Sequence, residues 1–462
     1  MLPHHRLIVV CALAVTGWTS ALAAGDLDDR INEYLSACEN VLHFNGAVLV
    51  KHQGQVLVSR GMGMANFEHE VPNTPQTKFR IGSITKSFTA LLTLQQVQAS
   101  KLSLDDPINK YLIDPPAAWE PITVHHLLSH TSGIVNFTNS LEYLARRSVL
   151  GKPDKVVGMF RDKPLRFTPG ERFEYSNSAY LLLGQILEEV SGKGYAELMH
   201  EQVFEPFAMR DSGYDLSTAL IPHRAQGYTR ANDVVHNAVF VDMRGVFAAG
   251  ALFSTVEDLA KYDAGLTAGK LLSAELYEKL YTPVKNDYAY GWVIEPHEGG
   301  RYIWHNGGID GFSANLTRCP EHKTCVVVLS NFDDGQPDRI GRELMSLLFG
   351  EEYRLPRVRE VTKINTAVYE SLVGRYQLSP AMILTITRDG DHLYAQLTRQ
   401  PRLEVFPESE SEFFYKAVDA QLAFAKDSAG KTTHITLYQG GRKLILKRVE
   451  DATDDEAAAT EE

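Results

Sequence analysis

A serine and a lysine three positions apart, Ser83 and Lys86, form the most informative motif of this 462-residue chain. Residues at this spacing share one face of a helix, so the hydroxyl and the amine can come within hydrogen-bonding range. A serine hydroxyl is a poor nucleophile until a base takes its proton, and a lysine removed from water can be that base. Apolar residues at helical spacing continue to about Ser100, which predicts an amphipathic helix that carries the pair.

A second motif, Tyr175-Ser176-Asn177, is the only Tyr-x-Asn sequence of the chain. A tyrosine phenol can relay a proton between a nucleophile and a leaving group. The asparagine side chain offers both a donor and an acceptor, which suits it to hold the lysine and a substrate amide. We therefore place Tyr175 with the catalytic candidates Ser83 and Lys86, and Asn177 with the residues that orient substrate.

A third motif, His305-Asn306-Gly307-Gly308, follows later in the chain. Gly307 and Gly308 would let a strand approach a bound substrate closely, because they carry no side chain. His305 and Asn306 are candidates for binding or orienting that substrate. An imidazole is only partly charged near neutral pH, so His305 offers less fixed positive charge than a lysine would.

The order of these motifs resembles the serine β-lactamase and penicillin-binding protein superfamily, above all class C β-lactamases, D,D-peptidases, D-aminopeptidases and related esterases. The resemblance covers roughly residues 27 to 350. It includes these further segments: Gly61–Asn66, Phe79–Ser83, Thr123–Gly133 and Phe253–Asp258. It implies an α/β (α+β) β-lactamase-like domain with an antiparallel sheet flanked by helices and a helical lobe. It also implies an acyl-enzyme mechanism without metal or organic cofactor, with the backbone amides of Ser83 and Gly308 as the oxyanion hole. His305 and Asn306 depart from the lysine and the threonine or serine that are usual there.

Other motifs have simpler explanations. Ser428 and Lys431 repeat the Ser-x-x-Lys spacing, but in a polar, glycine-containing run that predicts a turn. His126 and His130 have a spacing compatible with zinc, yet no glutamate follows His126, and we predict a structural helix there. Gly311–Asn315 lacks the final glycine of a nucleophile elbow.

Composition limits the classes of function. Hydrophobic residues make up 44% and charged residues 23% of the chain, which indicates a packed globular protein. A net charge of −12 argues against nucleic acid as a partner, because phosphate binding requires a basic face. We expect a small-molecule or peptide substrate, and the oligomeric state stays open.

The N-terminus has the pattern of a secretory signal. Basic residues precede an uncharged apolar run from Leu7 to Leu22, and small residues at Ala21 and Ala23 suit cleavage after Ala23. The alternative is a retained membrane anchor, because the run is nearly long enough to span a bilayer. We predict a periplasmic or secreted protein without a stable membrane span after cleavage. In such an oxidising compartment we expect a disulfide between Cys319 and Cys325, across a predicted hairpin, and a buried free thiol at Cys38.

Composition and pattern divide the chain into five parts: a signal peptide (1–23), the hydrolase domain (24–352), a charged, proline-interrupted linker (353–366), an all-β domain (367–449) and a disordered acidic tail (450–462). In the hydrolase domain, strands predicted near both ends form one antiparallel sheet, and the helices between them form the second lobe. Short strands separated by turns predict a small β-barrel after residue 366, similar to the lipocalin-like domain often appended to this family. We expect the barrel to pack against the hydrolase lobe.

The sequence thus predicts an exported serine hydrolase, with the bond and the substrate open. We favour a peptidase or amidase that acts on small or D-residue-containing peptides. The alternatives are a carboxylesterase, a weak β-lactamase or penicillin-binding protein, and a non-catalytic sensor of peptidoglycan fragments. The complete set Ser83, Lys86, Tyr175 and Asn177 argues against the sensor, because a binding protein needs no proton relay.

Overall fold

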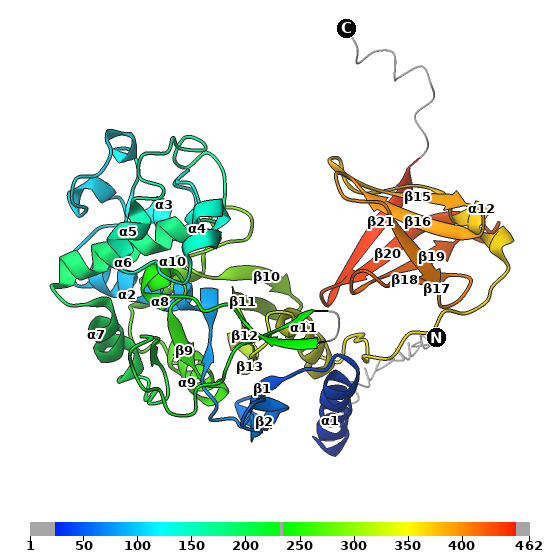
Figure 1. The fold of residues 1–462 in the computed structure, drawn as a ribbon, viewed down its shortest axis with the longest axis horizontal. Helices are drawn as coiled ribbons and strands as arrows, with labels where there is room; N and C mark the ends of the chain where they lie inside the picture. The colour runs from blue at the N-terminus through cyan, green and yellow to red at the C-terminus, as the bar shows by residue number, and fades with distance from the viewer. Residues whose placement is uncertain (1–23, 232–233, 450–462) are drawn as a thin grey trace, which may run out of the picture.

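The computed structural model describes residues 24–231 and 234–449 (Figure 1). The predicted signal peptide and the predicted acidic tail lie outside the described residues. Across the described ranges, no helix combines the length and the apolar character that crossing a bilayer requires.

One antiparallel sheet of six strands forms the centre of the hydrolase domain, in the order β10-β11-β12-β13-β1-β2. It joins the two ends of the domain, as predicted, because β1 pairs with β13. The inner strands are apolar on both faces, since layers of helices cover both. The strands are β1 Gly46–His52, β2 Gln55–Met62, β10 Val293–His297, β11 Gly300–Ile309, β12 Phe312–Cys319 and β13 Thr324–Ser330.

Helices α1 (Ala24–Val41) and α11 (Pro337–Leu348) cover one face of this sheet with their own apolar cluster. The larger core lies on the other face, between the sheet and the helical lobe. Figure 1 shows that lobe on the far side of the sheet from α1. The helices of this second face are α2 Thr85–Gln98, α3 Val124–Leu128, α4 Leu141–Arg146, α5 Pro153–Val157, α6 Asn177–Ser191, α7 Tyr195–Met199, α8 Met243–Val246, α9 Val256–Thr267 and α10 Ala274–Tyr281.

Helix α2 is buried nearly all round, whereas its sequence predicts an amphipathic helix. Its polar residues are tolerated inside because their hydroxyls bond to backbone carbonyls of the same helix. Thr89 donates to the Thr85 carbonyl at 3.2 Å, and Thr93 donates to the Thr89 carbonyl at 2.8 Å. The predicted helix is therefore confirmed, but it crosses the middle of the domain.

A buried ion cluster fixes α9 against the sheet. The Arg318 guanidinium on β12 donates to the Asp263 carboxylate on α9 at 2.8 Å and to the Tyr281 hydroxyl at 2.6 Å. Lys51 on β1 pairs with the same carboxylate. Because Arg318 and Asp263 are almost completely buried, removal of either partner would leave an uncompensated charge in the core.

The C-terminal domain is a closed barrel in which eight antiparallel strands follow one another in chain order, as the short strands predicted. Alternate side chains fill its interior, including those of Leu393, Leu422 and Ile435. A short helix, α12 (Tyr369–Leu372), precedes the barrel. The strands are β14 Gly374–Ser379, β15 Met382–Asp389, β16 His392–Leu397, β17 Leu403–Pro407, β18 Glu412–Tyr415, β19 Ala420–Lys426, β20 Thr432–Gln439 and β21 Arg442–Val449.

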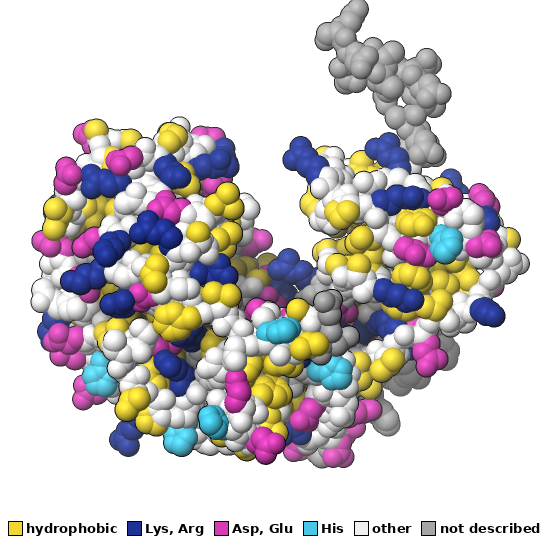
Figure 2. All heavy atoms as spheres, viewed as in Figure 1, with side chains coloured by type: hydrophobic (Ala, Val, Ile, Leu, Met, Phe, Trp, Pro, Cys, Tyr) yellow, Lys and Arg dark blue, Asp and Glu magenta, His cyan; other side chains and the backbone are white. Residues whose placement is uncertain are grey.

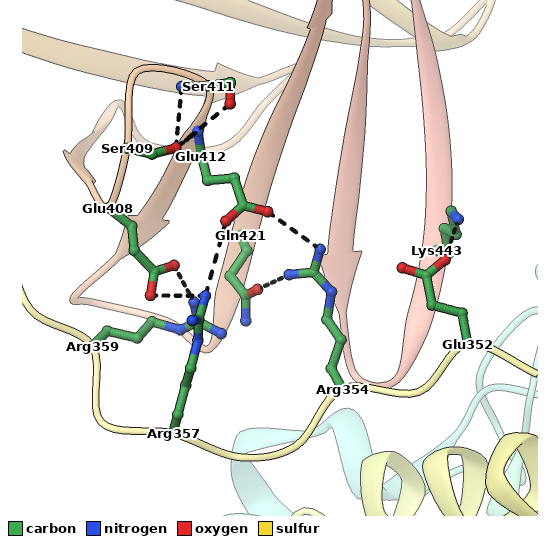
Figure 3. A network of polar contacts seen from close by, with 10 residues as sticks. All are labelled: Glu352, Arg354, Arg357, Arg359, Glu408, Ser409, Ser411, Glu412, Gln421 and Lys443. Atoms are coloured by element: carbon green, nitrogen blue, oxygen red, sulfur yellow. Dashed lines mark hydrogen bonds and ion pairs between the residues drawn. The ribbon is translucent and has the colours of Figure 1, made fainter.

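Arginines of the segment between the domains bind the barrel (Figure 3). Arg359 and Arg357 both contact the Glu408 carboxylate, at 2.7 and 3.0 Å, and Arg354 donates to the Gln421 side chain. Above this contact region the helical lobe and the barrel stand apart, with a notch between them (Figure 2). The barrel therefore meets the hydrolase domain at its base and not along the helical lobe.

The predicted disulfide is wrong, because all three cysteines of the described residues are free. In the hairpin of β12 and β13, Cys319 lies opposite Thr324, and Cys325 lies opposite Arg318. The two cysteines are thus one residue out of register, and side chains of neighbouring strand positions point to opposite faces. Cys319 packs in the cluster below α11, whereas Cys325 packs in the larger core.

We predict that Cys38, Cys319 and Cys325 are reduced in the native protein. Alkylation of the purified protein after denaturation without reductant should modify all three thiols, as peptide mass spectrometry would show. A peptide pair linked between Cys319 and Cys325, lighter by two hydrogens, would contradict the observed register.

Candidate functional site

Ser83 lies in a single turn of 3-10 helix, Gly82–Ile84, directly before α2. Two glycines allow this turn to press against β11. Gly82 has a left-handed backbone (φ +49°), and a Cβ there would lie 2.8 Å from the Gly308 nitrogen. A Cβ on Gly307 would lie 2.0 Å from the Ile81 carbonyl oxygen and 3.1 Å from the Ser83 nitrogen. The contact packs the Ser83 turn against the strand segment that carries Gly308. That the backbone amides of Ser83 and Gly308 form an oxyanion hole stays a prediction of the family resemblance.

The Lys86 side chain is completely buried beside Ser83. Its amine lies 3.1 Å from the Ser83 hydroxyl oxygen and donates to the Asn177 side-chain oxygen and the Ala249 carbonyl, both at 2.7 Å. These acceptors are all uncharged. Burial therefore lowers the pKa of Lys86 well below the usual value for lysine. A lowered pKa lets the amine give up its proton more readily, and the unprotonated amine can act as a general base toward the serine hydroxyl beside it.

The Tyr175 phenol also belongs to this group. Burial raises the pKa of Tyr175, and its hydrogen bond with Ser83 acts in the opposite direction. The phenol therefore keeps its proton near neutral pH. The Lys86 nitrogen lies 4.8 Å from the centre of the tyrosine ring, so serine, lysine and tyrosine are in mutual reach. The structure thus brings together residues that the sequence separates by about a hundred positions.

Asn177 is the first residue of α6 and has a fixed orientation. Its side-chain nitrogen donates to the Thr138 hydroxyl at 3.0 Å, which leaves its oxygen directed at Lys86. Thr138 in turn donates to the Asn136 side-chain oxygen at 3.0 Å, and that oxygen also accepts the Asn177 backbone N–H at 3.0 Å. Sequence reasoning missed Asn136 and Thr138. No sequence pattern marks them, because apolar and polar residues are mixed over residues 134–139.

His305 is buried and uncharged. Its Nδ1 lies 2.5 Å from the Asn306 carbonyl oxygen, which can only accept, so Nδ1 carries the hydrogen. Its Nε2 therefore accepts from the Tyr288 hydroxyl at 3.1 Å. Burial is the main cause that lowers the pKa of His305 to about 3, and a proton on nearby Lys86 acts in the same direction. A site that holds a lysine in related enzymes thus has no positive charge here at neutral pH.

Asn306 does not face the site, which corrects its assignment as a substrate-orienting residue. Its side chain donates to the Asp338 carboxylate at 2.7 Å, at the start of α11 on the opposite face of the sheet. The reason is strand geometry, because neighbouring residues of β11 point to opposite faces and His305 already faces Ser83. Asn315 on β12 donates to the same carboxylate at 2.8 Å.

The two histidines with a zinc-compatible spacing serve the local fold. His126 completes the cap of α3 by accepting the Thr123 backbone N–H at 3.1 Å. The His130 ring is buried, with its centre 4.3 Å from that of Tyr175, and its Nδ1 accepts the Ser176 backbone N–H at 3.1 Å. His130 therefore supports the segment that carries the tyrosine.

Comparisons with known proteins agree with this geometry. The family model described as Beta-lactamase matches residues 39–348, and a domain of unknown function, DUF3471, matches residues 358–458. Penicillin-binding protein 4* of Bacillus subtilis is 28% identical over 90% of this chain and 95% of its own length. Teichoic acid D-alanine hydrolase of Staphylococcus aureus is 27% identical over 58% of this chain and 66% of its own length. The solved octameric penicillin-binding protein homologue from Pyrococcus abyssi has a TM-score of 0.66 and 28% identity, over 92% of this chain and 100% of that chain.

A serine beside a buried lysine, on a sheet enclosed by helices, defines the class of this protein as a serine hydrolase. More particularly, the chain belongs to the beta-lactamase family, whose model spans most of the hydrolase domain.

We predict that Thr138 acts through the orientation of Asn177. Thr138→Val removes the hydroxyl at nearly constant volume, so the amide loses its anchor and presents its oxygen to Lys86 less often. The expected result is a loss of about tenfold in kcat/KM, the equivalent of one hydrogen bond of about 1.4 kcal/mol. Steady-state kinetics measures it, and Thr138→Ser, which keeps the hydroxyl, is the control. Equal activity of the valine and serine variants would contradict the role.

Proposed function

We propose that the protein hydrolyses small amides or peptides, with D-residues in the acyl part, through an acyl-enzyme on Ser83. The observation that carries the proposal is the Lys86 amine, buried among uncharged acceptors and 3.1 Å from the Ser83 oxygen. Burial of this kind lowers the pKa of a lysine, which suits the amine to act as the base that takes the serine proton.

The proton traffic follows from the contacts. Lys86 takes the Ser83 proton as the serine oxygen bonds to the carbonyl carbon, and the amides of Ser83 and Gly308 stabilise the resulting oxyanion. Such a donor contributes about 10²–10³ in rate. Tyr175 passes its proton to the leaving nitrogen and regains one from Lys86, while the scissile bond breaks. Water then attacks the acyl-enzyme and gives its proton to the same pair, which returns Ser83 to its hydroxyl form.

The substrate class rests on charge. An uncharged His305 gives no fixed cation for a free carboxylate of the substrate, such as that of a penicillin or of a peptide C-terminus. This favours amides and esters that carry no free carboxylate next to the scissile bond. The likeness to teichoic acid D-alanine hydrolase supports D-alanyl groups among them. Esters remain the second candidate, because an alkoxide leaves more easily than an amine and needs nothing that this site lacks.

We also propose that the protein is exported. The support is the signal-like pattern of residues 1–23. The expected disulfide no longer contributes to this argument, since Cys319 and Cys325 are free.

The first test is covalent labelling with a fluorophosphonate. We expect one adduct, on the peptide that contains Ser83, and none in Ser83→Ala at an unchanged melting temperature. The variant should also lose hydrolysis of every substrate. Turnover retained by Ser83→Ala, or an adduct on another serine, would refute the assignment of the nucleophile.

A second test, with a panel of substrates, decides the substrate class. D-alanine anilide and methyl ester should be cleaved with higher kcat/KM than D-alanyl-D-alanine and benzylpenicillin, because the first two have no carboxylate next to the scissile bond. L-alanine anilide is the stereochemical control. Equal rates for the D and L compounds, or preference for benzylpenicillin, would contradict the proposal.

The pH dependence of kcat/KM tests the base. Because burial lowers the pKa of Lys86, the neutral amine should predominate well below the solution value of about 10.4. We expect activity to fall on the acid side as the amine gains a proton, and to reach its plateau before pH 10. Lys86→Arg should be inactive at every pH, since a guanidinium does not give up its proton. A profile that still rises through pH 10 would contradict a neutral Lys86.

A further inference from the structure

The tip of one barrel hairpin lies directly on the hydrolase domain. Strands β20 and β21 are joined by the two-residue turn Gly440-Gly441, both in the left-handed conformation (φ +58° and +72°). A Cβ on Gly441 would lie 3.0 Å from the Arg342 Cβ and 3.2 Å from the Arg339 Cα, both on α11. The glycines thus allow the hairpin to touch the helix backbone.

The residue after this turn, Arg442, reaches the strand that carries the active-site glycines. Its guanidinium lies 5.9 Å from the Trp304 ring centre and 3.6 Å from the Glu295 carboxylate. Arg342 of α11 lies 4.8 Å from the same ring and bonds to the same carboxylate at 2.8 and 3.1 Å. One arginine from each domain therefore shares Trp304 and Glu295, at distances typical of cation–π contacts and ion pairs.

Helix α11 binds the strand at a second point. Asp338 accepts the Asn306 side chain, and its neighbour Arg339 pairs with Asp419 of the barrel. Trp304 and Asn306 flank His305 on β11 and lie on the face opposite Ser83. Both residues are thus held by groups that the barrel contacts.

We propose that the barrel hairpin positions β11 from behind the sheet, with Arg442 and Trp304 as positioning residues for the Gly308 amide. This inference rests on the function proposed above, because it assigns the strand to oxyanion binding. A displaced strand would move that amide away from the Ser83 amide without touching the serine, the lysine or the tyrosine.

The test compares Arg442→Ala with Arg402→Ala in the full chain. Arg402 is a matched control, because its guanidinium also lies over an aromatic ring, at 3.7 Å from the centre of Tyr394, but both of these residues belong to the barrel. We expect Arg442→Ala to lower kcat about tenfold with little change in KM. A misplacement of 1 Å costs about 10²-fold, and the expected displacement of the strand is smaller than that. Arg442→Lys should recover part of the loss, and Arg402→Ala should match the wild type.

Hydrogen–deuterium exchange provides a second readout that needs no substrate. Amides of residues 304–309 should exchange faster in Arg442→Ala than in the wild type and in Arg402→Ala. Wild-type exchange of this segment in Arg442→Ala, wild-type kcat, or an equal loss in Arg402→Ala would each overturn the inference. If the wild type takes no fluorophosphonate label, the proposed function fails, and the exchange result alone then decides whether the hairpin holds β11.

Discussion

A lysine amine without solvent contact or a carboxylate partner is the constraint around which this site is built. An unpaired ammonium in the interior would cost several kcal/mol, so burial lowers the pKa of Lys86 well below the usual value for lysine. Its partners come from three separate segments: the amine donates to Asn177 at the start of α6 and to the Ala249 carbonyl, and its nitrogen faces the hydroxyl of the Ser83 turn. Each segment must be in place before the amine is satisfied. The environment of the catalytic base therefore depends on the packing of α2 against α6.

Burial also disfavours the charged form of His305. Two cationic groups close together in a buried site would repel one another, and the imidazole avoids this by bonding through both nitrogens to neutral groups. Lys86 therefore remains the one group of the three motifs that can become a cation there. A site with two lysines could carry two positive charges. Here the second charge is absent because the residue is a histidine, and because both of its nitrogens bond to neutral groups, the Tyr288 hydroxyl and the Asn306 carbonyl.

Much of this arrangement could be predicted from the sequence, where local spacing carries the information. The pair Ser83 and Lys86, the start of α6 at Asn177 and the sheet that joins both ends of the domain are examples. The assignment of Asn306 to substrate orientation was wrong. A sequence motif shows only that Asn306 follows His305, whereas the alternation of side chains along a strand decides which of the two faces the site.

Other parts depend on contacts that no local pattern shows. Thr138 and Tyr288 are far from the motifs they support, and their sequence neighbourhoods have no periodicity that would indicate this. The sequence also does not show that Cys319 lies opposite Thr324 and not opposite Cys325. The turn at Pro320–His322 and the left-handed Lys323 set this strand register, and loop length alone does not specify it. Barrel strands β17 and β18 are only five and four residues long, too short for an alternating pattern to delimit them in the sequence.

The topology of the two domains has a consequence for how the chain folds. In the barrel every strand pairs with its neighbours in sequence, and one further pairing, of β14 with β21, closes it. The hydrolase sheet is different, because Asn45, just before β1, and Ser330, at the end of β13, are in contact although they are 285 residues apart in the sequence. Non-local pairings are slow, since the chain must close a long loop before any contact forms. During synthesis β1 therefore has no partner strand on the β13 side until residue 330 has left the ribosome. Until then its unpaired edge can form incorrect pairings.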